Sequence, residues 1–71
     1  VRAEYIMLRL RTEKGIDLLD YGFRFGVSLL TEKEKEIKKL LSAKVIEIND
    51  NILKATDKGF YLLNSVITEL L

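Results

Sequence analysis

The chain has 71 residues, of which 48% are hydrophobic and 32% charged, and its formal net charge is +1. This length is enough for one domain, and the near-neutral balance gives no overall attraction to nucleic acid or anionic lipid. Cysteine and histidine are both absent, which excludes disulfides, thiolate metal sites and a histidine proton shuttle, and no apolar run reaches the roughly 20 residues of a membrane span.

The first predicted helix covers about residues 2–12 and is apolar on two sides. One stripe has the spacing of three and four residues that is typical of a core-facing helix. It consists of Ala3, Ile6, Met7 and Leu10. Three further apolar side chains lie nearly opposite, namely Val1, Tyr5 and Leu8. Such a helix needs cover on both sides, so it is either sandwiched inside this domain or in contact with another part of a longer protein.

A short second helix is predicted at about residues 18–25. Gly15 supplies the backbone freedom that ends the preceding helical region, and Asp17 is a good N-cap for the new helix. Gly26 is the expected C-terminal stop. The helix is dense in apolar and aromatic residues, which are Leu18, Leu19, Tyr21, Phe23 and Phe25.

The third predicted helix covers about residues 32–43. Thr31 and Glu34 have the spacing of a capping box, in which each side chain bonds to the backbone of the other residue. The expected core-facing side chains are Ile37, Leu40 and Leu41. Two β-branched runs follow, at residues 45–49 and 52–56. Asp50 and Asn51 separate them and tolerate positive φ, so they predict a β-hairpin.

The last predicted helix begins after Thr56, which is its N-cap, and Asp57 is favourably placed in its first turn. Its apolar stripe consists of Phe60, Leu63, Val66, Ile67, Leu70 and Leu71. The resulting order is helix, helix, helix, β-hairpin, helix. The fold class is therefore mainly α with a small β-hairpin (α+β), in a winged-helix-like arrangement.

A winged helix invites the hypothesis of nucleic-acid binding, in which the third helix would be the recognition helix. Its N-terminal end carries Glu32, Glu34 and Glu36, which would meet phosphates with the wrong charge. The hairpin tip, residues 49–51, is acidic or neutral where a DNA-binding wing needs lysine or arginine. The charges favour a solvated face, and a nucleic-acid-binding module remains the alternative from another class.

Candidate catalytic and metal-binding residues are scarce. The three glutamates of the third helix are spaced by two, so they spread around the helix instead of converging on an ion. One constellation could meet a porphyrin, with flat aromatic surface and cations for its carboxylates. It combines Arg9, Arg11 and Arg24 with Tyr5, Tyr21, Phe23 and Phe25. The alternative is that these aromatics belong to the core and the arginines to its rim.

Four segments together carry a family resemblance. They are residues 7–17 (MLRLRTEKGID), residues 23–26 (FRFG), the hairpin, and residues 56–59 (TDKG) leading into Asn64. In order and spacing they resemble the C-terminal domain of the oxygen-independent coproporphyrinogen III oxidase-like family. The resemblance spans essentially the whole chain. One departure is Ala55, where relatives tend to carry a larger aliphatic residue.

The resemblance implies a cytoplasmic parent protein of heme and porphyrin biosynthesis, of which residues 1–71 would be a single C-terminal accessory domain. The parent would be a radical-SAM oxidoreductase that binds a [4Fe-4S] cluster and S-adenosylmethionine and decarboxylates coproporphyrinogen III. Some relatives bind and deliver heme instead. No catalytic, cofactor-binding or metal-binding residue of the family falls in this chain. The domain is expected to pack on the catalytic barrel through Val1, Tyr5 and Leu8 and to help cover the substrate site.

Overall fold

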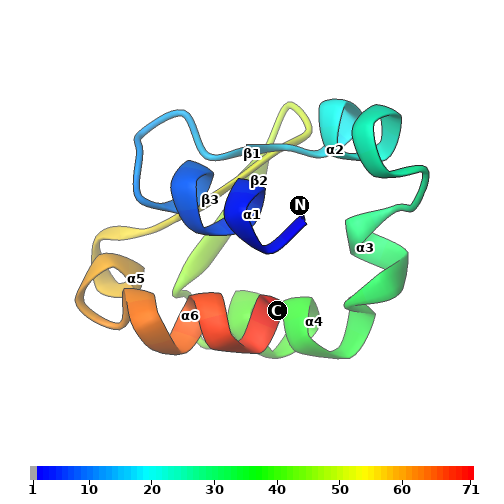
Figure 1. Cartoon of the computed structure of the whole chain (residues 1–71). Helices are drawn as coiled ribbons and strands as arrows, with labels where there is room; N and C mark the ends of the chain where they lie inside the picture. Colours follow the sequence, from blue (N-terminus) through cyan, green and yellow to red (C-terminus); the bar gives the residue numbers. More distant parts are fainter. Residues whose placement is uncertain (1) are drawn as a thin grey trace.

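The computed structural model describes residues 2–71, and it confirms the mainly helical α+β class (Figure 1). The elements are α1 (Arg2–Leu10), β1 (Ile16–Asp17), α2 (Leu18–Phe25), α3 (Leu29–Glu32), α4 (Glu34–Ser42), β2 (Ile46–Asn49), β3 (Ile52–Ala55), α5 (Asp57–Tyr61) and α6 (Leu63–Leu70). The predicted order is present, with one additional strand and with the third and last helices each divided in two.

The three strands form one antiparallel sheet in the order β1-β3-β2. Leu53 of the central strand β3 lies opposite Ile16 on one side and Ile48 on the other, and its side chain is fully buried. The predicted hairpin is confirmed, because Asp50 and Asn51 at its tip have φ values of 51° and 64°. Strand β1 was not predicted, since its two residues give no alternating pattern of their own.

The core lies between the sheet and the helices. In Figure 1, α1 crosses in front of the strands, while α4 and α6 run side by side beneath it, and α1 contacts α6, β1 and β3. This placement buries Ile6 and Leu10 of α1, as predicted. The buried cluster consists of Ile6, Leu10, Ile16, Tyr21, Leu29, Ile37, Leu40, Val45, Ile46, Leu53, Val66, Ile67 and Leu70.

Helix α2 has the predicted bounds and both predicted caps. The Asp17 carboxylate accepts hydrogen bonds from the backbone N–H groups of Leu19 and Asp20, at 3.0 and 3.1 Å. Gly26 ends the helix with a φ of 68°. The first helix ends at Leu10, two residues before the predicted end at Thr12, whose N–H group donates to the Arg9 carbonyl in a closing turn.

The predicted capping box at Thr31 and Glu34 is wrong. Ser28 is the N-cap, since its hydroxyl accepts from the Thr31 N–H group at 3.4 Å, and Thr31 lies inside the short helix α3. The helix is then interrupted at Lys33, which has a φ of −118°, before α4 begins. The helix starts earlier because Leu29 is buried in the core, and a Thr within a helix cannot act as its cap.

Thr56 caps the last helical region as predicted, but the helix breaks at Leu62 into α5 and α6. The break changes which apolar side chains face the core. Val66, Ile67 and Leu70 are buried, whereas Phe60 and Leu71 are exposed, contrary to the predicted stripe. Leu41 of α4 is also exposed, so its predicted core position is wrong.

No helix within residues 2–71 is long and apolar enough to cross a membrane.

Candidate functional site

Three of the four aromatic residues of the predicted constellation come together where α1 packs on α2. Tyr5 of α1 makes edge-to-face contacts with Tyr21 and Phe25 of α2, at centroid distances of 5.8 and 5.6 Å. Tyr21 and Phe25 are 4.8 Å apart in the same geometry. Tyr21 is buried, so it anchors this cluster to the core. We call the set of Tyr5, Asp20, Tyr21, Arg24 and Phe25 the α1–α2 junction.

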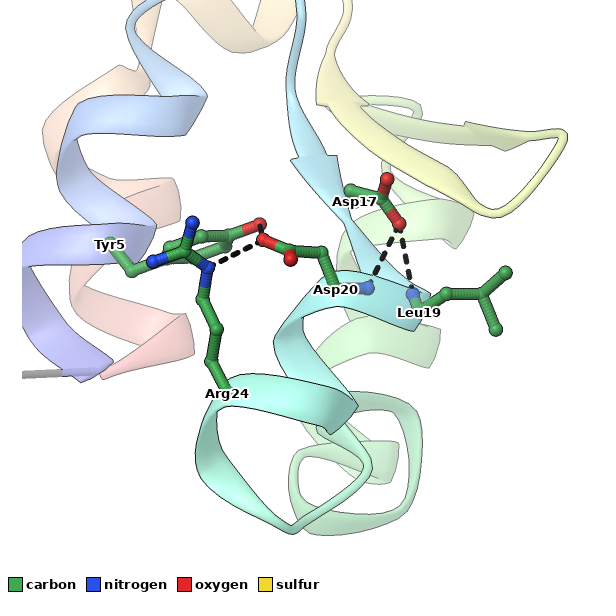
Figure 2. Close-up of polar contacts among 5 residues, drawn as sticks. All are labelled: Tyr5, Asp17, Leu19, Asp20 and Arg24. Atoms are coloured by element: carbon green, nitrogen blue, oxygen red, sulfur yellow. Dashed lines mark hydrogen bonds and ion pairs between the residues drawn. The ribbon is translucent and has the colours of Figure 1, made fainter.

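A single carboxylate ties the two helices together at the surface of this junction (Figure 2). One oxygen of Asp20 accepts a hydrogen bond from the Tyr5 hydroxyl at 2.9 Å and another from Arg24 Nε at 2.7 Å. The Arg24 hydrogen bond and then that of Tyr5 lower the pKa of the Asp20 carboxyl. Burial, followed by the hydrogen bond to Asp20, raises the pKa of the Tyr5 hydroxyl. Asp20 is therefore ionised at neutral pH and Tyr5 is protonated.

Two of the three predicted arginines reach the cluster. The guanidinium carbons of Arg9 and Arg24 lie 5.2 and 5.5 Å from the centroid of the Tyr5 ring, within the range of a cation–π interaction. Arg11 is exposed beyond the C-terminal end of α1. Phe23 also points away, with 92% of its surface exposed. Since Arg24 already binds Asp20, an incoming carboxylate would compete with that ion pair.

The residues of the predicted docking face differ in how exposed they are. Val1 lies outside the described residues. Tyr5 is half-buried in the α1–α2 junction, and Leu8 is 65% exposed. A shallow hollow brings Leu8 together with Tyr5 and Phe25, and Glu4 and Arg24 line its polar edge. Leu8 is thus the exposed apolar centre of this face.

Two further apolar patches are exposed in the structure. The first, which we call the α2 ridge, consists of Leu19 and Phe23, 65% and 92% exposed. Their spacing of four places them on one side of α2, and Figure 2 shows Leu19 pointing away from Tyr5, Asp20 and Arg24. The second, which we call the α5–α6 corner, consists of Phe60, Tyr61 and Leu62. The spacing of Leu19 and Phe23 was a readable signal that the general apolar density of this helix obscured.

The TDKG segment has a structural role. The Thr56 hydroxyl donates to the Lys44 carbonyl at 2.7 Å and accepts from the Gly59 N–H group at 3.1 Å. The Thr56 N–H group donates to the Val45 carbonyl at 3.0 Å, and Lys58 Nζ donates to a carbonyl at the end of α4 at 3.1 Å. We call this region the hairpin–α5 junction. It fastens the end of α4 and the start of β2 to the beginning of α5.

Gly59 allows α5 to pack directly against the backbone at Val45. A Cβ atom at Gly59 would lie 1.8 Å from the Val45 carbonyl oxygen, a distance that real Cβ atoms do not adopt. Only a residue without a side chain allows α5 to pack on that backbone. The close contact that this early glycine permits is therefore the one with Val45.

Helix α4 has the charge pattern expected of a solvated face. Glu34 pairs with Lys38 at 3.1 Å, and Lys39 pairs with Glu69 of α6 at 2.8 Å. The hydrogen bond that Lys39 donates to the Glu69 carboxylate raises the pKa of Lys39. These lysines are engaged by carboxylates, which weakens their use as phosphate contacts. Nor do residues 2–71 contain a group of three or more acidic side chains that could hold a metal ion.

A comparison with protein-family models matches residues 2–62 to the family described as HemN C-terminal domain. The match includes the α1–α2 junction, the α2 ridge and the TDKG segment, and it ends at the break between α5 and α6. Comparisons with curated proteins and with solved structures found no match.

Proposed function

Because the chain belongs to the HemN C-terminal domain family, we propose that it is the accessory domain of an oxygen-independent coproporphyrinogen III oxidase-like radical-SAM protein. The family match over residues 2–62 carries this proposal. In the proposed parent protein, which is cytoplasmic, the domain packs on the catalytic barrel of the same polypeptide and helps to cover the substrate site.

The parent's cofactors would be held by other parts of the polypeptide. A [4Fe-4S] cluster needs thiolate ligands, and this chain has neither cysteine nor histidine. S-adenosylmethionine would likewise be held by those other parts of the polypeptide. The cluster and S-adenosylmethionine supply the radical chemistry when bound. The contribution of these residues is therefore contact and cover, and no reaction step passes through them.

The face around Leu8 is our candidate for contact with the barrel. Its exposed leucine sits in a hollow beside Tyr5 and Phe25, so a complementary apolar side chain would find a preformed surface there. The hydrogen bond from Tyr5 to Asp20 links α1 to α2 beside that surface, and the bond from Arg24 to Asp20 within α2 holds the carboxylate in place. Rigid, partly apolar surfaces lose little conformational entropy on association.

The same face offers one cation to a substrate carboxylate. Arg9 stacks on Tyr5, and a guanidinium held in this way can still present two parallel N–H groups to a carboxylate. Arg24 is a weaker candidate because its Nε already donates to Asp20. Arg11 lies outside the cluster. Replacement of Arg9 by Ala in the full-length protein should therefore raise KM for a porphyrin substrate more than replacement of Arg11.

The direct test uses the full-length parent, reconstituted anaerobically with iron and sulfide and supplied with S-adenosylmethionine and coproporphyrinogen III. Formation of protoporphyrinogen would support the oxidase assignment. Heme binding without turnover would overturn it in favour of a heme-chaperone parent. Failure to assemble any cluster would contradict a radical-SAM parent altogether.

The docking face has its own test. Leu8→Glu in the full-length protein should expose the linker between barrel and domain to limited proteolysis, because a buried charge would disrupt the apolar contact. Tyr61→Glu is the control, since Tyr61 is also exposed, more so than Leu8, but lies at the α5–α6 corner. Equal cleavage of both variants and the unmodified protein would refute the Leu8 face.

A further inference from the structure

Helix α6 fills a groove of the domain mainly through apolar side chains. Val66, Ile67 and Leu70 are buried in the same cluster as side chains of α1 and α4, and α6 lies against both of these helices. An exposed ion pair between Lys39 of α4 and Glu69 adds a polar contact. We call the surface of α1 and α4 that α6 covers the α1–α4 groove. An amphipathic helix laid in such a groove is a mode in which separate chains also bind one another.

A single residue, Leu62, separates α6 from α5, and the chain bends there (Figure 1). Its φ of −114° and ψ of 27° interrupt the helix. Sharp breaks in helices usually occur at proline or glycine, but leucine favours helices, and neither breaker lies between Phe60 and Leu70. The sequence therefore permits one continuous helix from Asp57 to Leu70. Only the break at Leu62 lets α6 turn back into the α1–α4 groove of its own chain.

The α5–α6 corner surrounds this hinge with exposed apolar surface. Phe60, Tyr61 and Leu62 follow one another and are 42%, 91% and 48% exposed. A run of exposed apolar side chains is typical of a surface that another molecule covers. Straightening of the hinge would carry α6 away from its own domain, so the α1–α4 groove would then need a new occupant.

We propose that α6 is exchanged between two copies of the protein, so that each copy places its α6 in the α1–α4 groove of the other. The fit of this occupant is given by the fold, because α6 of a second copy is identical to the helix that lies in the groove. A very short hinge favours such exchange, since it resists the bend that a closed monomer requires. This inference depends on the fold alone and stands apart from the proposed function.

Exchange keeps the favourable contacts of the monomer and adds two more. The burial of Val66, Ile67 and Leu70 and the Lys39–Glu69 ion pair are the same in both states. The dimer gains a continuous helix through Leu62 at each hinge. The two hinges also meet at its twofold axis, so the α5–α6 corners can cover each other. These gains offset the entropy lost on association.

The Lys39–Glu69 ion pair reads the exchange directly. Its charged atoms are 2.8 Å apart, so a carbodiimide can join them as an amide. One copy of the full-length protein carries Lys39→Arg, which keeps the charge but does not form this amide, and the other carries Glu69→Gln. Neither variant alone can give the product. After co-expression we expect mass spectrometry of the dimer fraction to find Lys39 of one copy joined to Glu69 of the other.

A second measurement addresses the hinge. Leu62→Ala and Leu62→Gly both remove the exposed leucine side chain, but glycine disfavours a continuous helix at each of the two hinges. Analytical ultracentrifugation should therefore give an association constant for the alanine variant that exceeds that of the glycine variant by about tenfold or more.

The unmodified protein is the positive control for the cross-link, because the ion pair is present in monomer and dimer alike. The proposal fails if this control gives the 39–69 amide and the co-expressed variants do not. A protein that stays monomeric at every concentration would also overturn it. Equal association constants for the two Leu62 variants would contradict a dimer that depends on a straightened hinge.

Discussion

The hairpin–α5 junction and the α1–α2 junction both connect segments distant in sequence, but by different means. At the hairpin–α5 junction the backbone of Gly59 packs directly on the carbonyl of Val45, and Thr56 bonds to two other backbone groups. At the α1–α2 junction one partly exposed carboxylate links two side chains. A backbone contact leaves no room for change, whereas a surface contact between side chains can be altered without unfolding. We therefore expect the α1–α2 junction to tolerate side-chain substitutions that alter binding, whereas the hairpin–α5 junction should not.

The largest effect should come from Gly59→Ala. The added Cβ would collide with backbone that cannot move aside, so we expect a loss of about 3 kcal/mol or more of unfolding free energy. Domains of this size have only about 4–10 kcal/mol in total. Thermal unfolding followed by circular dichroism would measure the loss.

The matched control is Gly22→Ala in α2. There the nearest atom to an added Cβ is 3.9 Å away, and alanine is the better helix former by about 1 kcal/mol. This variant should be as stable as the unmodified protein or more so. Similar losses for both variants would break the contrast between the two junctions.

Thr56→Ala should have an intermediate effect. It removes the N-cap of α5 and the hydrogen bond to the Lys44 carbonyl, a combined loss of about 2 kcal/mol. Thr56→Ser keeps the hydroxyl and should recover most of the stability in denaturant titrations. A serine variant as unstable as the alanine variant would show that the methyl group matters more than the hydrogen bonds.

Tyr5→Phe tests the α1–α2 junction and should cost less. The ring keeps its contacts with Tyr21 and Phe25, and only the hydrogen bond to Asp20 is lost, which we expect to lower stability by less than about 1 kcal/mol. Urea unfolding of this variant would be compared with Tyr61→Phe, whose hydroxyl is at an exposed position. A loss as large as that of Gly59→Ala would mean that the surface bond is a main support of the fold.

The smallest effect should be the pH dependence contributed by Asp20. Its pKa is lower in the folded than in the unfolded state, where the ordinary value is 3.8. The unfolded chain therefore binds the proton first, and the stabilisation is lost as pH falls below 3.8 towards the folded pKa. The difference in melting temperature between the unmodified protein and Asp20→Asn should shrink over that range. A constant difference down to acid pH would show that the charge of Asp20 plays no part.

The candidate site was only partly predictable. The contact of Arg9 and Arg24 with the aromatic cluster was predicted as a group of cations near Tyr5, and the structure brings them together. The role of Asp20 was missed, because its partner Tyr5 is 15 residues away and no local pattern connects them. The exposure of Phe23 was left open, because the sequence assigned its ring either to an aromatic surface that could meet a porphyrin or to the core.

Local chemistry determined much of this protein from the sequence alone. The Asp17 cap, the Gly26 stop, the Asp50-Asn51 turn and the Thr56 cap act within four residues, and the structure has them all. The family resemblance was likewise readable from short segments, and residues 2–62 match that family.

The tertiary structure alone decided the pairing of β1 with β3, the helix breaks at Lys33 and Leu62, and the choice between buried and exposed leucines. Ile16 pairs with Leu53 and Gly59 packs on Val45 only after the chain has folded back on itself. Such contacts depend on the shape of the whole core. A periodic pattern cannot state which apolar side chains that core has room to bury.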